Sequence, residues 1–210
     1  MGHKCGPFSS WCQPTSTYTT MSQCAVFIDG GYLCKITETY FNRASIDFQK
    51  LSDYLSGATP RLRTYYYDCM PYQSNPPSSA EQQKYASKAR FFHAISRKVQ
   101  RFQIRQGKLR KIGPGQFEQK RVDVLLGIDM VRLSSKKQID LVILIAGDAD
   151  LVPAVEASKE EGSIVRLYYK HGSVSDELLN VCDERYEIDQ EFIDKTREVV
   201  VPVSPSQTTP

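Results

Sequence analysis

The chain has 210 residues, of which 40% are hydrophobic and 24% charged, with a net charge of +3. This length and composition suit a single globular domain and exclude collagenous and wholly disordered chains. No apolar run approaches the roughly 18 residues of a spanning helix, which excludes an integral membrane protein. Residues 1–23 lack the basic and apolar regions of a signal peptide. We therefore expect a cytoplasmic protein with no membrane partner.

The cysteine pattern indicates reduced thiols rather than a disulfide framework. Six cysteines are present, none in a CxxC pair, and the chain is neither short nor evidently secreted. The spacing of His3, Cys5 and Cys12 matches no common zinc site, so a zinc centre at this end of the chain is disfavoured.

Composition divides the chain into one domain and two tails. Residues 1–23 are rich in Ser and Thr, and the end of the chain reads PVSPSQTTP. Such segments cannot bury enough apolar surface to fold. We expect a flexible tail over 1–23, a domain over 24–195 and a second flexible tail over 196–210.

Strand and helix patterns alternate along the domain. The apolar run 24–28 predicts a buried strand followed by a turn at Asp29, and LVILIA (141–146) predicts the strongest strand of the chain. In the predicted helix 123–133, Leu125 and Ile128 are expected to face inward, together with Met130 or Val131. Further strands are expected over 62–69, 99–105, 164–169 and 186–188, and helices over 46–55, 81–96, 150–161 and 175–181. This alternation predicts an α/β fold with a mainly parallel sheet and helices on both faces.

Aspartates follow the two most apolar strands. Asp29 follows the first and Asp148 follows the LVILIA strand. Ligands of open parallel sheets bind beyond the carboxyl ends of the strands, and adjacent strands lie ~4.8 Å apart. If these strands are neighbours, the two carboxylates meet, and a divalent cation such as Mg²⁺ or Mn²⁺ relieves their repulsion. Each Asp could otherwise simply cap a turn.

Three further aspartates have both structural and functional interpretations. Asp123 and Asp150 each stand at the start of a predicted helix, where a carboxylate can be a cap, a metal ligand or both. Asp129 lies about 240° around the helix from Asp123, so one helix face cannot present both. We expect Asp129 to pair with Arg132 at i+3, with a lesser claim to support the site.

Three segments in this order, AVFIDGGYL (25–33), KRVDVLLGIDM (120–130) and IAGDADLVPAVE (145–156), resemble the NYN family of PIN-like nucleases, most closely its LabA-like subgroup. The resemblance implies a Rossmann-like PIN fold and a metal-dependent ribonuclease. It implies Asp29, Asp123, Asp148 and Asp150 as catalytic residues and as ligands of Mg²⁺ or Mn²⁺. Many relatives carry Asn three positions after the first aspartate, where this chain has Tyr32, whose hydroxyl reaches farther and cannot do both jobs of an amide group, which can position a substrate phosphate or a metal-bound water.

A basic stretch supplies the expected contact with RNA. Residues 84–111 hold ten Lys or Arg and no acid, whereas residues 112–210 carry 11 basic and 18 acidic residues. Lysine and arginine neutralise backbone phosphates, and aromatic residues of the stretch could stack on bases. The alternative is a solvated helix face. The expected RNA-binding residues are Lys98, Arg101, Arg105, Lys108, Arg110, Lys120 and Arg121.

Other enzyme classes lack their motifs in this chain. Only three histidines are present, no Ser/His/Asp or Cys/His set competes, and there is no P-loop or GxGxxG after a strand. The preferred hypothesis is an endoribonuclease acting through a metal. The alternatives are a non-catalytic RNA-binding or regulatory module with the same fold and, more remotely, a phosphatase or acceptor-aspartate protein. A homo-oligomer is compatible with each of these hypotheses.

Overall fold

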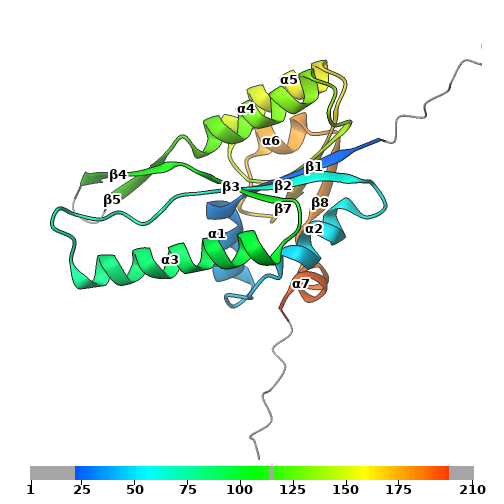
Figure 1. Cartoon of the computed structure of the whole chain (residues 1–210). Helices are drawn as coiled ribbons and strands as arrows, with labels where there is room; N and C mark the ends of the chain where they lie inside the picture. The colour runs from blue at the N-terminus through cyan, green and yellow to red at the C-terminus, as the bar shows by residue number, and fades with distance from the viewer. Residues whose placement is uncertain (1–21, 114–115, 199–210) are drawn as a thin grey trace, which may run out of the picture.

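The structure is a computed structural model that describes residues 22–113 and 116–198, and its centre is a six-stranded sheet (Figure 1). All neighbouring strands of this sheet are parallel, in the order β3-β2-β1-β6-β7-β8. The strand order reverses between β1 and β6. The strands are β1 (Cys24–Asp29), β2 (Arg61–Asp68), β3 (Phe102–Gln106), β6 (Leu141–Ile145), β7 (Ile164–Tyr169) and β8 (Glu184–Glu187).

Helices cover both faces of the sheet, which confirms the predicted α/β architecture. One face carries α1 (Gly30–Tyr40), α2 (Phe48–Ser56), α3 (Ser79–Lys98) and α7 (Gln190–Thr196), and the other carries α4 (Val122–Ser135), α5 (Val152–Glu160) and α6 (Asp176–Val181). The two-residue period of β1 divides its side chains between the two core layers. Val26 and Ile28 pack with the first set of helices, and Ala25 and Phe27 pack with the second.

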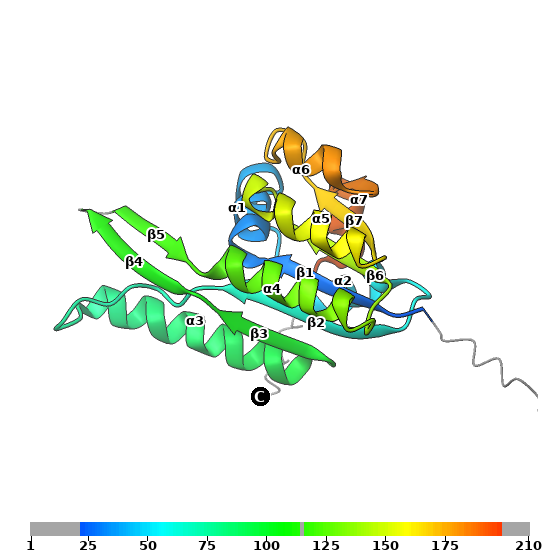
Figure 2. The same ribbon diagram turned by 90° about the horizontal axis from the view of Figure 1, so that it is seen from above.

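A two-stranded hairpin projects from the sheet beside the N-terminal half of α3 (Figure 2). It consists of β4 (Lys108–Gly113) and β5 (Gln116–Lys120), which are antiparallel. None of the strands predicted from the sequence covers this segment. The chain enters the hairpin through Gly107, whose amide donates to the Asp68 carbonyl at 3.0 Å, and leaves it through Arg121 at a left-handed φ of 79°. Both ends of the hairpin therefore lie at the carboxyl edge of the sheet.

Two expectations about helices were wrong. The turn expected after Asp29 is the start of α1, an 11-residue helix that Asp29 caps. In α4 the inward face is formed by Leu126, Met130 and Leu133, which confirms the expectation for Met130, whereas Ile128 is 56% exposed. Leu125 is only partly buried. The helix packs against both the sheet and α5, and this contact, which the sequence pattern does not reveal, selects the buried face.

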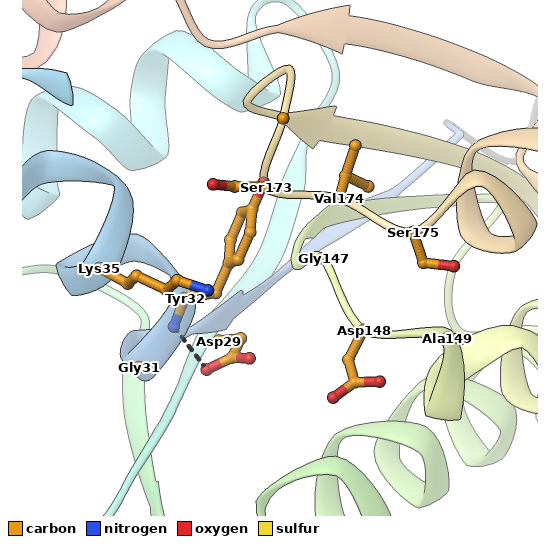
Figure 3. A pocket seen from close by; sticks show the side chains of 11 residues that line it. Asp29, Gly31, Tyr32, Lys35, Gly147, Asp148, Ala149, Ser173, Val174 and Ser175 are labelled. Atoms are coloured by element: carbon orange, nitrogen blue, oxygen red, sulfur yellow. Dashed lines mark hydrogen bonds between the residues drawn. The ribbon is translucent and has the colours of Figure 1, made fainter. Parts of the chain in front are cut away.

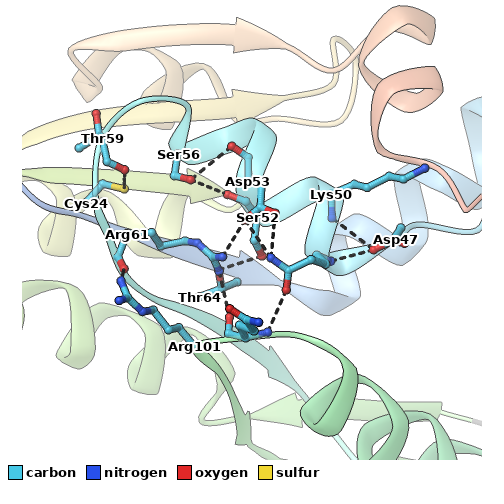
Figure 4. Close-up of polar contacts among 12 residues, drawn as sticks. Cys24, Asp47, Lys50, Ser52, Asp53, Ser56, Thr59, Arg61, Thr64 and Arg101 are labelled. Atoms are coloured by element: carbon cyan, nitrogen blue, oxygen red, sulfur yellow. Dashed lines mark hydrogen bonds and ion pairs between the residues drawn. The ribbon is translucent and has the colours of Figure 1, made fainter.

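The amino edge of the sheet is closed by a polar network around Arg61 (Figure 4). The Arg61 guanidinium donates to Thr64 Oγ1 at 2.7 Å and to Asp53 Oδ1 at 2.9 Å. Thr64 Oγ1 in turn donates to Ser52 Oγ, and Arg101 Nη1 donates to the Arg61 carbonyl. The network joins α2 to the starts of β2 and β3. Within the part of the chain that the structure describes, no helix is long and apolar enough to cross a membrane.

Candidate functional site

Asp29 and Asp148 leave the sheet at the same edge, where the strand order reverses. Asp29 ends β1, and its Oδ1 accepts the amide hydrogen of Tyr32 at 3.1 Å, which caps α1. Asp148 follows β6 and caps the 3-10 turn Ala149–Leu151, with Oδ1 accepting from the Asp150 amide at 3.1 Å. The two strands, β1 and β6, are hydrogen-bonded neighbours, which is the condition under which the sequence predicted that the two carboxylates would meet. A ligand site beyond the carboxyl ends of strands fits this location.

The two carboxylates line one pocket of about 600 Å³ (Figure 3). α1 forms one wall, the chain after β6 a second, and the segment between β7 and α6 a third. Asp29 is half-buried and Asp148 is exposed, so both can be approached from solvent. The lining residues are Asp29, Gly31, Tyr32, Lys35, Gly147, Asp148, Ala149, Gly172, Ser173, Val174 and Ser175.

Negative charge accumulates at this edge. Burial raises the pKa of Asp29 to about 6; the Tyr32 amide opposes the rise, and the charges of Asp123 and Asp68 add to it. Asp123 lies in the first turn of α4, and its pKa is raised by burial and then by Asp148 and Asp150. These couplings place Asp123 in the electrostatic field of both strand ends. Asp150 is exposed beside Asp148.

The donor set suits a hard divalent cation. Mg²⁺ keeps several waters and needs only one or two protein carboxylates together with substrate phosphates. Asp29 and Asp148 supply that pair on one pocket, and Asp123 adds charge beside them. Over residues 22–113 and 116–198, however, no three His, Cys, Asp or Glu side chains are grouped so as to ligate one ion. His3, Cys5 and Cys12 lie outside those ranges.

Asp68 is an acid of the same edge that the sequence analysis missed. It ends β2, next to β1, and is 5% exposed. Its carboxylate accepts from Tyr66 Oη at 3.0 Å and from the Cys69 amide at 2.7 Å, and pairs with Lys88 of α3. The signal was present, because Asp68 lies near the carboxyl end of the predicted strand 62–69. Its partners compensate its charge, which sets it apart from Asp29.

Asp129 lies on α4, and its buried carboxylate pairs with two arginines that are partly exposed. Asp129 is 5% exposed, and its Oδ1 is 2.8 Å from Arg132 Nη2, which confirms the expected i+3 partner. Arg105 Nε lies 3.0 Å from Oδ2, and Tyr67 Oη donates to the same oxygen at 2.9 Å. The carboxylate therefore joins α4 to β2 and β3, and it does not line the pocket.

The basic residues expected to bind RNA fall into two groups. Lys98 ends α3 and Arg101 precedes β3, so both lie at the amino edge of the sheet, opposite the aspartates. Lys98 pairs with Asp47 and Glu198, and Arg101 takes part in the Arg61 network. The structure does not bring these two residues together with the carboxylates.

The second group lies at or beyond the carboxyl edge. Arg105 is near the end of β3 but is held by Asp129. Lys108 begins β4 and is exposed, and Arg121 is exposed two residues before Asp123. Arg110 lies within β4 and Lys120 ends β5, so the backbone carries both into the projecting hairpin.

Tyr32 has a structural task that an Asn could not perform. It is 8% exposed, and its ring packs so closely on Gly147 that a Cβ there would lie 2.3 Å from the ring. Its hydroxyl accepts the amide hydrogen of Lys170 at 2.9 Å. Tyr32 therefore ties α1 to the ends of β6 and β7 and forms part of the pocket wall.

Comparisons with known proteins identify this arrangement. The NYN domain family matches residues 23–189. An uncharacterized protein of Methanocaldococcus jannaschii is 30% identical over 100 residues, which cover 45% of this chain and 40% of that protein. A crystal structure of a protein of unknown function from Vibrio parahaemolyticus superimposes with a TM-score of 0.57 at 22% identity, covering 82% of this chain and 96% of that one. At this level of identity, the likeness shows a shared fold and nothing more.

Proposed function

The chain belongs to the NYN domain family, whose members are nuclease-like, and from that premise we propose that it is a metal-dependent ribonuclease. The observation that carries the proposal is the meeting of Asp29 and Asp148 on one pocket at the strand-order reversal. A protein that only gripped RNA would have no need to gather carboxylates beside a polyanion.

The aspartates have distinct parts in the proposed reaction. Asp29 and Asp148 would hold Mg²⁺ or Mn²⁺, with Asp123 and Asp150 as supporting charges. A bound cation supplies water activation and charge stabilisation at the phosphate. The helix caps that Asp29 and Asp148 form fix one oxygen of each carboxylate, so both side chains are oriented before substrate arrives.

The exposed cations near the carboxyl edge would hold the RNA backbone. Lys108 and Arg121 lie together at the base of the hairpin, because Lys108 pairs with Lys120, and there they can neutralise backbone phosphates. Arg110 and Lys120 follow along the hairpin strands. Lys98 and Arg101 fit this task less well, because they lie at the opposite edge and have intramolecular partners.

A non-catalytic RNA-binding module is the second candidate, and one observation favours it. No three acidic, Cys or His side chains in the described ranges are grouped to ligate one ion. The two candidates separate in one assay: labelled single-stranded RNA is incubated with purified protein in Mn²⁺, Mg²⁺ or EDTA. A ribonuclease gives fragments that EDTA and Asp148→Asn abolish. Binding without cleavage in every cation supports the module. In a parallel reaction with labelled single-stranded DNA, cleavage of the DNA but not of the RNA would show that the substrate is DNA.

A further inference from the structure

The pocket extends well beyond the two aspartates, away from the basic hairpin. Asp29 and Asp148 stand at one end, and the remainder is lined by α1 and the segment 172–175. Arg121 and Lys108, at the base of the hairpin, are not among the lining residues. A backbone that crosses the aspartates from the hairpin therefore continues into this pocket.

Lys35 is the one cation among the described residues that line the pocket. It lies on the second turn of α1 and is exposed, and its side chain reaches toward the pocket interior (Figure 3). No described acid forms an ion pair with it, whereas Lys88, Lys98, Lys159 and Lys170 all have such partners. An unpaired ammonium beside two carboxylates is suited to a ligand that carries its own negative charge.

The far wall of the pocket is fixed by hydrogen bonds before any ligand arrives. The Lys170 amide donates to Tyr32 Oη at 2.9 Å, and the Ser175 amide donates to the Gly147 carbonyl at 2.9 Å. Ser173 Oγ lies 3.1 Å from Tyr40 Oη. A wall held in this way loses little conformational freedom when a ligand binds.

We propose that this pocket holds one nucleotide of the substrate next to the bond that is cut, with its phosphate at Lys35. This inference rests on the proposed nuclease function and adds a subsite to it. The volume of about 600 Å³ lies within the range of small-molecule sites and accommodates one nucleotide. Ser173 and Ser175 offer hydroxyls to a sugar or base, and Val174 and the Tyr32 ring offer apolar surface. A single lysine matches a single phosphate.

The subsite predicts binding of free nucleotides, which can be measured without cleavage. The probes are 5′-AMP, 3′-AMP and adenosine, titrated calorimetrically into the full chain with Ca²⁺ present. We expect one of the two nucleotides to bind at least about tenfold more tightly than adenosine, because a charge-assisted contact to the phosphate is lost in adenosine. The tighter of the two identifies the side of the scissile bond that occupies the pocket.

Substitutions assign the binding to Lys35. Lys35→Met keeps the approximate length of the side chain and removes its charge, and it should weaken binding of the favoured nucleotide roughly tenfold or more. Lys35→Arg should restore most of the affinity. The matched control is Lys136→Met, which removes an exposed lysine at the end of α4 and should change nothing. Melting curves of all variants verify that each is folded.

The outcomes separate this subsite from the nuclease proposal. Nucleotide binding that depends on Lys35 supports the subsite even where RNA is not cut, and in that case only the nuclease activity fails. Absence of nucleotide binding in the wild-type protein, or equal binding by wild type and Lys35→Met, overturns the subsite even where RNA is cleaved.

Discussion

Tyr67 and Asp129 are joined by a hydrogen bond of 2.9 Å between a fully buried phenol and a buried carboxylate. The contact links β2 to α4, the helix whose first turn carries Asp123. Arg105 and Arg132 complete the shell of the carboxylate. Asp129 therefore fixes α4 against β2 and β3, although it is not part of the pocket.

Removal of the Asp129 charge should destabilise the fold. Asp129→Asn removes the charge with which two partly exposed arginines pair, and we expect the free energy of unfolding to fall by about 2 kcal/mol, the scale for hydrogen bonds to a charged group. Tyr67→Phe removes one hydrogen bond and should cost about 1 kcal/mol. The control Asp194→Asn affects an exposed pair with Arg197 and should cost under ~1 kcal/mol. Urea unfolding measures all three, and equal effects of Asp129→Asn and Asp194→Asn would contradict this role of Asp129.

Ionisation of Asp29 should lower the free energy of unfolding of the metal-free protein. Its pKa rises from 3.8 to about 6 on folding, mainly through burial. The penalty is absent below pH 3.8, grows as the pH rises through this window, and is complete above about 6, where linkage gives up to about 3 kcal/mol. Asp29→Asn keeps a capping side chain without the charge.

In EDTA at pH 7.5, Asp29→Asn should therefore unfold at higher urea than the wild-type protein, and the difference should shrink toward pH 4. Urea titrations across this range give the measurement. A variant that is less stable than wild type at pH 7.5 but equal at pH 4 would reverse the sign and refute the interpretation.

Divalent cations should stabilise the native protein. A ligand that binds only the folded state raises stability by RT ln(1 + [L]/Kd), which is about 2.7 kcal/mol at a concentration 100 times Kd. Thermal melts in Mn²⁺ and in EDTA should differ, and the difference should vanish in the double variant Asp29→Asn/Asp148→Asn. Asp129→Asn should retain it, because Asp129 is not on the pocket. Identical wild-type melts in both media would exclude a cation site.

Cleavage should depend on Asp148 in particular. Asp148→Asn retains an N-cap for the turn Ala149–Leu151 and loses the charge, so the fold should persist. We expect the rate of RNA cleavage in Mn²⁺ to fall about 100-fold or more, the scale for loss of a group that stabilises transition-state charge. Rates follow from gel analysis of labelled RNA, with Asp194→Asn as the control. An undiminished rate that EDTA still abolishes would remove Asp148 from the site.

The two groups of basic residues should differ in their contribution to the salt dependence of RNA binding. Each phosphate contact contributes about −0.7 to the slope of log K against log salt for single strands. Lys108→Ala/Arg121→Ala should flatten the slope by about 1.4, whereas Lys98→Ala/Arg101→Ala, at the opposite edge, should leave it unchanged. Fluorescence anisotropy of labelled RNA in Ca²⁺ measures both. The reverse result would place the RNA along the amino edge of the sheet.

The sequence predicted the parts of the fold that depend on apolar periodicity. The runs before Asp29 and Asp148 are apolar enough to be recognised as buried strands, and parallel topology then brings their ends to one edge. Helix α1 escaped prediction because it begins with two glycines, which favour turns, and only its cap and tertiary packing make it helical. Tertiary packing likewise selects the buried face of α4, which its own sequence does not mark.

Charge alone could not show where each basic residue lies. Residues 84–111 look like one positive stretch, but α3 runs antiparallel to β3, the edge strand of the sheet. Lys98 and Arg101 therefore lie at the amino edge of the sheet, whereas Lys108 lies at its carboxyl edge. The role of Tyr32 also depends on a partner distant in sequence, the Lys170 amide. Such contacts between distant segments are visible only in the folded chain.

The hairpin β4–β5 divides the chain into two halves that each hold an incomplete site. A protease cut at its tip would leave Asp29 and Lys108 on one fragment, and Asp148 and Arg121 on the other. The pairing of β1 with β6 is what brings the two carboxylates to one pocket. Neither half carries both carboxylates of the pocket, and a ribosome must synthesise the chain beyond Asp148 before both exist together. The topology thus delays the appearance of the site until most of the domain has been made.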